Sequence, residues 1–224
     1  TLERFDVALA NGAEMQFGGS LSLANDWTPQ TLSLSMASKQ MHFDLFHAFW
    51  PQWLKPATRQ WVADRIPAGL VQDATINLVA ALDGTQPQIE TLTGSLGIAN
   101  AEMTLLGAAP PMSNVYGKLS LEEDVATIVL NQANIADLAL QYGRVTIASP
   151  LVGPLGGTVP QAEAKMAFKG SLATAIAAGG EFGLGKIGVF ELAAMQPQGE
   201  VELSLIAAFP IQQRIDSEAI ALAI

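Results

Sequence analysis

The chain has 224 residues, of which 50% are hydrophobic and 14% are charged, and its formal net charge is −10. A typical soluble domain carries about 25% charged residues, so this chain is too apolar for a disordered protein and too acidic to attract nucleic acid. It has no cysteine, which excludes disulfides and thiolate metal sites, and no apolar run approaches the length of a membrane-spanning helix.

Apolar and polar side chains alternate with a period of two along most of the chain, as in 162–169. This period is typical of antiparallel strands that bury one face. Asn11-Gly12 and the acidic run Glu122–Asp124 are interpreted as hairpin turns, and the spacing of the acidic run does not match a calcium loop. We therefore predict a mainly β chain with one antiparallel meander. The strands are expected at 2–10, 14–23, 31–38, 70–82, 91–105, 113–121, 125–134, 138–148, 162–170 and 198–208.

Two interruptions of this alternation predict short helical insertions. The first covers about 51–66, with Pro56 in its first turn and Pro67 just beyond its end. The second covers about 171–195, where we expect Gly179-Gly180 to separate two short helices. Two short helices cannot cover ten strands, so the sequence predicts an apolar sheet face without a complete protein layer.

No group of residues indicates catalysis. The segment Gly183–Gly188 matches a dinucleotide-binding pattern, but it lacks a preceding buried strand and a suitably spaced acidic residue, so we interpret it as a loop. His42 and His47 lack a third metal ligand or a nucleophile, and Asp44 is their only local acidic neighbour. We therefore expect no enzyme, no catalytic residue, no metal and no cofactor.

Aromatic residues are concentrated around the first predicted helix. We favour a small core where that helix contacts the sheet, and the alternative is a contact with lipid chains or with a partner. The cluster comprises Phe43, Phe46, Phe49, Trp50, Trp53 and Trp61.

The stretch Phe49–Val62, followed by Pro67–Ala74, resembles the signature W-P-x-x-L-x-P-x-x-R-x-W-V … G-x-V-x-D of the AsmA-like family of Gram-negative bacteria, in its large YhdP-like subgroup. Pro110–Leu119, Gly143–Ile147 and Phe168–Leu172 resemble later steps of that family in the same order. The likeness spans about residues 20 to 210, although 179–197 is Gly-rich and departs from the family pattern. The motif residues, to which we assign a structural role, are Trp50, Pro51, Leu54, Pro56, Arg59, Trp61, Gly69 and Asp73.

The resemblance implies a long, twisted antiparallel sheet that is curled into an open groove, apolar inside and polar outside. Residues 1–224 would be a single segment of a repeating β-groove, without separate domains, within a longer protein of the periplasm that is anchored in the inner membrane. The implied activity is passive carriage of phospholipid between the inner and outer membranes, which supports lipid homeostasis of the outer membrane. The implied partners are phospholipid acyl chains and a protein of the outer membrane.

The residues expected to line the groove are apolar side chains at the inward positions of the strands, where each sheltered acyl methylene contributes about 0.8 kcal/mol. They are Leu34, Met36, Ile76, Leu78, Leu82, Val115, Leu119, Leu121, Met166, Phe168, Val201, Leu203 and Leu205. The alternation slips at Gly97–Ala101 and Asn131–Leu138, where a bulge could exchange the two faces. A second interpretation is a structural or assembly scaffold for outer-membrane biogenesis, whose edge strands pair with partner proteins.

Overall fold

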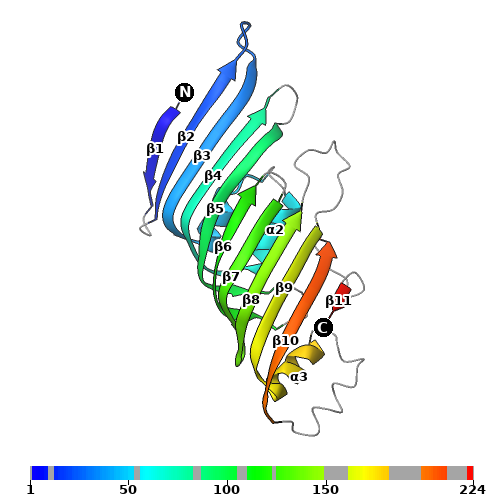
Figure 1. Cartoon of the computed structure of the whole chain (residues 1–224). Helices are drawn as coiled ribbons and strands as arrows, with labels where there is room; N and C mark the ends of the chain where they lie inside the picture. The colour runs from blue at the N-terminus through cyan, green and yellow to red at the C-terminus, as the bar shows by residue number, and fades with distance from the viewer. Residues whose placement is uncertain are drawn as a thin grey trace.

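The computed structural model describes residues 2–9, 13–52, 56–82, 87–104, 110–122, 125–148, 161–181, 198–210 and 221–223. These residues form one antiparallel sheet of eleven strands in which every strand pairs with its neighbours in the sequence (Figure 1). The chain is therefore mainly β, and the predicted meander is confirmed.

The ten predicted strands are all present, with β3 running past its predicted end to His42, and the short β11 is an addition. The pairing of β1 with β2 and of β6 with β7 confirms both predicted hairpins, while residues 10–12 and 123–124 lie outside the described residues. The strands are β1 (Leu2–Ala8), β2 (Glu14–Leu23), β3 (Pro29–His42), β4 (Ala68–Ala81), β5 (Gln88–Met103), β6 (Met112–Glu122), β7 (Val125–Ile135), β8 (Leu138–Ala148), β9 (Gln161–Ser171), β10 (Glu200–Pro210) and β11 (Ala221–Ala223).

Three helices accompany the sheet within the described residues: α1 (Phe43–Phe49), α2 (Pro56–Arg65) and α3 (Leu172–Glu181). The prediction of one helix over 51–66 is wrong at its start, because α2 begins at Pro56, where proline's missing N–H costs no hydrogen bond. The helix α1 was not predicted. No helix in this part of the chain combines the length and the apolarity that crossing a bilayer would require.

The helix α3 corrects a second expectation, because Gly179-Gly180 lies inside it and does not end it. Ala175 and Ala178 are buried in the main core, and this packing offsets the cost of about 1 kcal/mol that each helical glycine carries relative to alanine. The Ser171 Oγ accepts a hydrogen bond from the Thr174 N–H at 3.1 Å and so caps the helix. The second helix expected before residue 195 lies outside the described residues.

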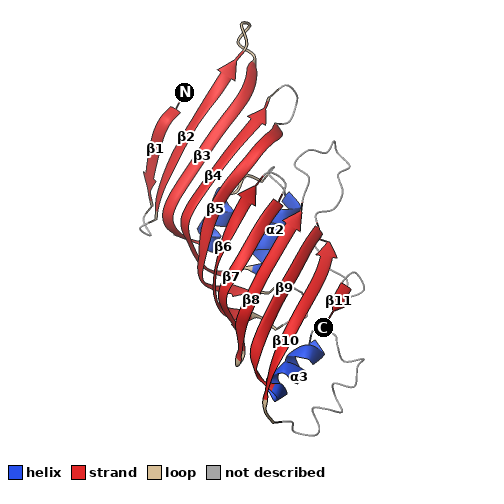
Figure 2. Ribbon diagram, in the orientation of Figure 1, coloured by secondary structure: helices blue, strands red, loops and turns tan. Residues whose placement is uncertain are grey.

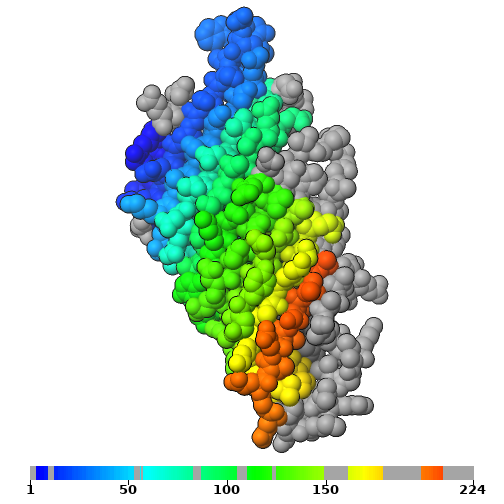
Figure 3. Space-filling view, viewed as in Figure 1, coloured from blue at the N-terminus to red at the C-terminus, as the bar shows by residue number. Residues whose placement is uncertain are grey.

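The sheet is open, as predicted, but it is not strongly curled, which differs from the curled groove that the resemblance implies. A sheet closes when its first strand pairs with its last, whereas β1 and β11 lie at opposite ends of this strand order. In Figure 2 the helix α2 lies behind the strands. From β2 to β9, the face toward the viewer in Figure 3 is formed by the strands themselves.

One face of the sheet carries the core. Buried apolar side chains recur at every second position, for example Ala162, Ala164, Met166 and Phe168 on β9, whereas Lys165 between them is exposed. Residues of α1, α2 and α3 belong to the same buried cluster. This inner face therefore lies toward the helices, and the polar side chains occupy the outer face.

A band of β-bulges crosses the sheet from β4 to β8. At each bulge one strand has one more residue than its partner, so the register of the pair shifts there. The extra residues lie at or beside Asp73, Asn100, Asn114, Asn131 and Gln141. The slips predicted at Gly97–Ala101 and near Asn131 are thus confirmed as bulges. The buried positions change parity at these points, as from Leu130 to Ala133, so the inner face stays apolar on both sides of the band.

The residue types in the band suit its backbone. Asp73, Asn100 and Asn114 have positive φ values of 46°, 48° and 50°, a left-handed conformation that Asn and Asp tolerate better than other residues with a Cβ. Gly69 has a φ of 136°, and a Cβ placed there would lie 2.6 Å from the Ala101 Cβ. The backbone therefore accounts for the motif residues Gly69 and Asp73.

Candidate functional site

The predicted groove-lining residues share the inner face of the sheet. Cross-strand pairing links Leu34 to Leu78, and it links Met166 to Leu205. Paired residues of neighbouring strands project to the same side of the sheet. Because side chains alternate along each strand, all the predicted lining residues except Leu82 project to this same inner face. Leu82 follows the last residue of β4, and its N–H donates to the Gln30 carbonyl at 2.7 Å.

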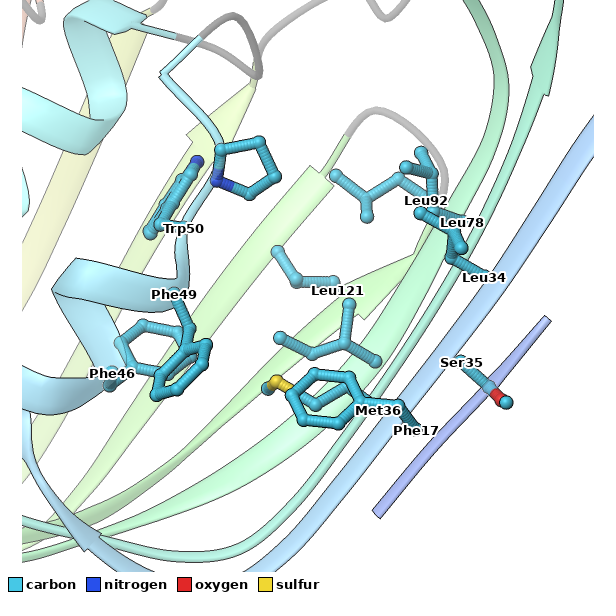
Figure 4. A pocket seen from close by; sticks show the side chains of 13 residues that line it. Phe17, Leu34, Ser35, Met36, Phe46, Phe49, Trp50, Leu78, Leu92 and Leu121 are labelled. Atoms are coloured by element: carbon cyan, nitrogen blue, oxygen red, sulfur yellow. The ribbon is translucent and has the colours of Figure 1, made fainter. Parts of the chain in front are cut away.

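An apolar cavity of about 220 Å³ lies on this face, between the sheet and α1 (Figure 4). An enclosed volume of about 150 Å³ is enough for a ligand of the size of benzene, so the cavity suits a segment of one alkyl chain. Its lining residues come from β2 to β6, from α1 and from the two residues that follow α1. They are Phe17, Gly18, Leu34, Ser35, Met36, Phe46, Phe49, Trp50, Pro51, Ile76, Leu78, Leu92 and Leu121.

Among the described residues, no ionisable side chain lines the cavity. Ser35 is the single hydroxyl residue of this described lining, and its hydroxyl points away from the cavity in Figure 4. The cross-strand partner of Ser35 on β4 is Asn77, a polar residue of the outer face. The described lining can therefore shelter apolar groups.

Aromatic rings form the wall of the cavity opposite the sheet. Phe46 and Trp50 meet edge to face with ring centroids 5.8 Å apart, and Phe49 contacts Phe17 of β2 at 5.9 Å. Phe43 and Phe46 are buried, whereas Phe49 is 37% exposed. The core interpretation is thus confirmed for Phe43 and Phe46, whereas Phe49 borders the cavity and a contact with lipid chains or a partner stays a prediction. Trp53 lies outside the described residues.

The family-motif residues support this wall. Trp50 and Pro51 line the cavity, and the Arg59 Nε donates to the Trp50 carbonyl at 3.0 Å while its Nη2 donates to the His47 carbonyl at 3.3 Å. Trp61 is 3% exposed and belongs to the core. Leu54 lies outside the described residues.

The remaining predicted lining residues lie away from the cavity. Val115, Met166, Phe168 and Leu205 are buried in the main core. A second group is half-buried on the same face: Leu119, Val201 and Leu203. The structure therefore gathers five of the predicted residues at the cavity, namely Leu34, Met36, Ile76, Leu78 and Leu121.

Eight cavity residues were not predicted as lining: Phe17, Gly18, Ser35, Phe46, Phe49, Trp50, Pro51 and Leu92. Phe17 and Leu92 do follow the alternation of their strands, since Phe17 pairs with Met36 and Leu92 pairs with Leu78. The same period-two signal could have identified both of them. Phe46 and Phe49 face the cavity only because α1 is a helix, which the sequence analysis did not predict.

The other candidate sites do not assemble in the part of the chain that the structure describes. His42 ends β3 and His47 lies in α1, and no group of three or more His, Asp or Glu that could hold a metal ion occurs among these residues. The Asp137 carboxylate lies beside α3, where hydrogen bonds with the side chains of Thr174 and Ser171 lower the pKa of Asp137. This arrangement caps a helix and lies apart from the cavity.

A comparison with known protein families, curated proteins and solved structures finds no match to this chain. The cavity and the apolar inner face are therefore the features on which a functional assignment rests.

Proposed function

We propose that this chain is a segment of a hydrophobic groove that carries phospholipid between the inner and outer membranes of a Gram-negative bacterium. The observation that carries the proposal is the cavity beneath α1, which is lined by apolar side chains from β2 to β6. Each acyl methylene that leaves water for such a surface contributes about 0.8 kcal/mol. The phospholipid head group stays in water, which agrees with the absence of charged side chains among the described lining residues.

The groove of this proposal is shallow along most of its length and deepest beneath α1. The inner face carries half-buried apolar residues beyond the cavity, such as Leu119 on β6 and Leu203 on β10. An acyl chain that lay along this face would contact them in turn. The resemblance to the AsmA-like family supports the same proposal, and with it a place in the periplasm, an inner-membrane anchor outside this sequence and a partner at the outer membrane.

Lipid uptake tests the proposal directly. The delipidated chain is incubated with phospholipid vesicles, separated from them, and analysed by mass spectrometry for bound lipid. We expect phospholipid to be recovered with the protein. Recovery of lipid-free protein at every vesicle concentration would contradict a lipid-carrying groove.

The ends of the sheet favour a second function, that of a scaffold which pairs strands with partner proteins. Among the described residues, β1 and β11 each pair with one neighbouring strand only, and Phe5 on β1 is 56% exposed. Such edges can accept a further strand. This function predicts that the vesicle experiment yields lipid-free protein and that a proline substitution in β1 abolishes the protein's role in the cell.

A further inference from the structure

The cavity is covered on its solvent side by one short helix. The helix α1 has seven residues, and its N-cap residue His42 makes no side-chain capping hydrogen bond. It supplies Phe46 and Phe49 to the lining, and Trp50 follows directly after its last residue. The cavity is partly open, since the lining residues Leu34 and Phe49 are 40% and 37% exposed, and the position of this one helix sets how wide the opening is.

Arg59 of α2 holds the C-terminal end of α1. Its guanidinium donates to the Trp50 carbonyl at 3.0 Å and to the His47 carbonyl at 3.3 Å. The His47 carbonyl also accepts from the Trp50 N–H at 3.3 Å, and a cation placed at the C-terminal end of a helix complements the helix dipole. Hydrogen bonds from a charged donor are the stronger kind, so Arg59 ties the end of α1 to α2 through two strong hydrogen bonds.

Two aromatic rings close the side of the cavity that faces β2. The rings of Phe17 and Phe49 have centroids 5.9 Å apart, and in Figure 4 both of them border the cavity. Leu34, which also lines the cavity, is 40% exposed. The closure at this side consists of side-chain contacts, which can separate without breaking the pairing of the sheet.

We propose that α1 is a flap over the cavity, that an acyl chain enters sideways between Phe17 and Phe49, and that Arg59 is the positioning residue that sets how readily the flap opens. This inference rests on the proposed function, because it takes an acyl chain as the ligand. It adds an access route in the middle of the groove, so that a lipid need not travel in from an end of the sheet.

Ligand exchange rates test the flap. Binding and release of dansyl-labelled undecanoic acid by the delipidated chain are followed by stopped-flow fluorescence. In Arg59→Ala we expect the association and dissociation rates to rise together by about tenfold, because hydrogen bonds from a charged donor are lost, while the Kd changes little. Arg59→Lys keeps the positive charge but loses the planar guanidinium group, so its association and dissociation rates should lie between those of wild type and those of Arg59→Ala. The matched control is Arg65→Ala, at the other end of α2.

A label on α1 gives a second measurement. The chain has no cysteine, so Ala48→Cys, at an exposed position of α1, accepts a single nitroxide without touching the lining. We expect Arg59→Ala to increase the mobility of this nitroxide and Arg65→Ala to leave it unchanged. Phe49→Ala removes the ring contact with Phe17 without altering Arg59, and it should also raise the association and dissociation rates of the probe. This variant therefore tests the flap even if Arg59→Ala fails to fold.

The outcomes separate the flap from the function that underlies it. Phospholipid uptake with unchanged exchange rates in Arg59→Ala and Phe49→Ala would overturn the flap alone. A weaker Kd that arises only from faster dissociation would assign Arg59 to ligand binding and would also overturn the flap. A wild-type chain that binds neither the probe nor phospholipid overturns the proposed function, and the flap with it.

Discussion

Replacing Leu34 by asparagine tests whether a lipid chain occupies the cavity. Leu34 lines the cavity and is 40% exposed without a ligand. Full burial of a leucine side chain contributes about 1.5–3 kcal/mol, so a lipid chain that covers the exposed fraction gains roughly 0.6–1.2 kcal/mol. Burying the asparagine amide without a partner costs about 1–3 kcal/mol more. The two terms together predict that lipid binds Leu34→Asn more weakly by about 2–4 kcal/mol, which is more than tenfold in Kd.

The assay compares phospholipid uptake by wild type, Leu34→Asn and the control Ser33→Asn. Ser33 is adjacent in β3 and pairs with Ser20 and Val79 on the outer face, so its replacement should leave uptake unchanged. Because Leu34 is partly buried, the substitution is also expected to reduce the free energy of unfolding by about 1–2 kcal/mol. Thermal denaturation establishes that both variants are folded at the assay temperature. Equal uptake by all three proteins would refute the placement of an acyl chain against Leu34.

Three further predictions concern the fold that positions the cavity. Asn114 has a φ of 50°, so Asn114→Gly should keep its stability in urea, whereas Asn114→Val should lose about 1–2 kcal/mol; equal stability would contradict a left-handed constraint. A Cβ added at Gly143 would lie 2.8 Å from the Leu130 Cβ, so Gly143→Ala should lower the unfolding free energy by about 1–3 kcal/mol; unchanged stability would contradict this close approach. The pKa of Asp137 is lowered chiefly by its hydrogen bond with Thr174, so its stabilising effect is present above about pH 3.9 and is lost as the pH falls through its lower folded-state pKa. The Tm of Asp137→Asn should therefore lie below that of wild type at neutral pH and converge with it in acid, and a constant difference would argue against this linkage.

The strands could be predicted from the sequence because their signal is local. Alternation along β9, from Ala162 to Phe168, reflects one buried and one solvated face, and short connections left an antiparallel meander as the simplest topology. The helix α1 could not be predicted in this way. It begins after His42, which makes no side-chain cap, and it is stabilised by aromatic packing and by Arg59, which lies in the next helix.

The candidate site could be predicted only in part, for the same reason. Alternation identified Met36 and Ile76 as residues of the inner face, and both line the cavity. It could not show where that face is hollow, because the hollow depends on where α1 lies above the sheet. Phe168 carries the same local signal and is buried in the main core. The period of two predicts the face of the sheet to which a side chain points. Whether that side chain is buried in the core or lines the cavity depends on tertiary packing.

The band of bulges ties the lengths of neighbouring strands together. Deleting Asn114 alone would turn half of β6 over, so that Lys118 faced inward and Leu119 faced outward. A second deletion on a neighbouring strand, at Asn100 of β5 or at Asn131 of β7, would restore the pairing of that strand with β6. The same deletion would then disturb the pairing of that strand with its other neighbour. Insertions and deletions in this sheet should therefore be inherited in groups across adjacent strands, and single-residue length changes should be confined to the connections between them.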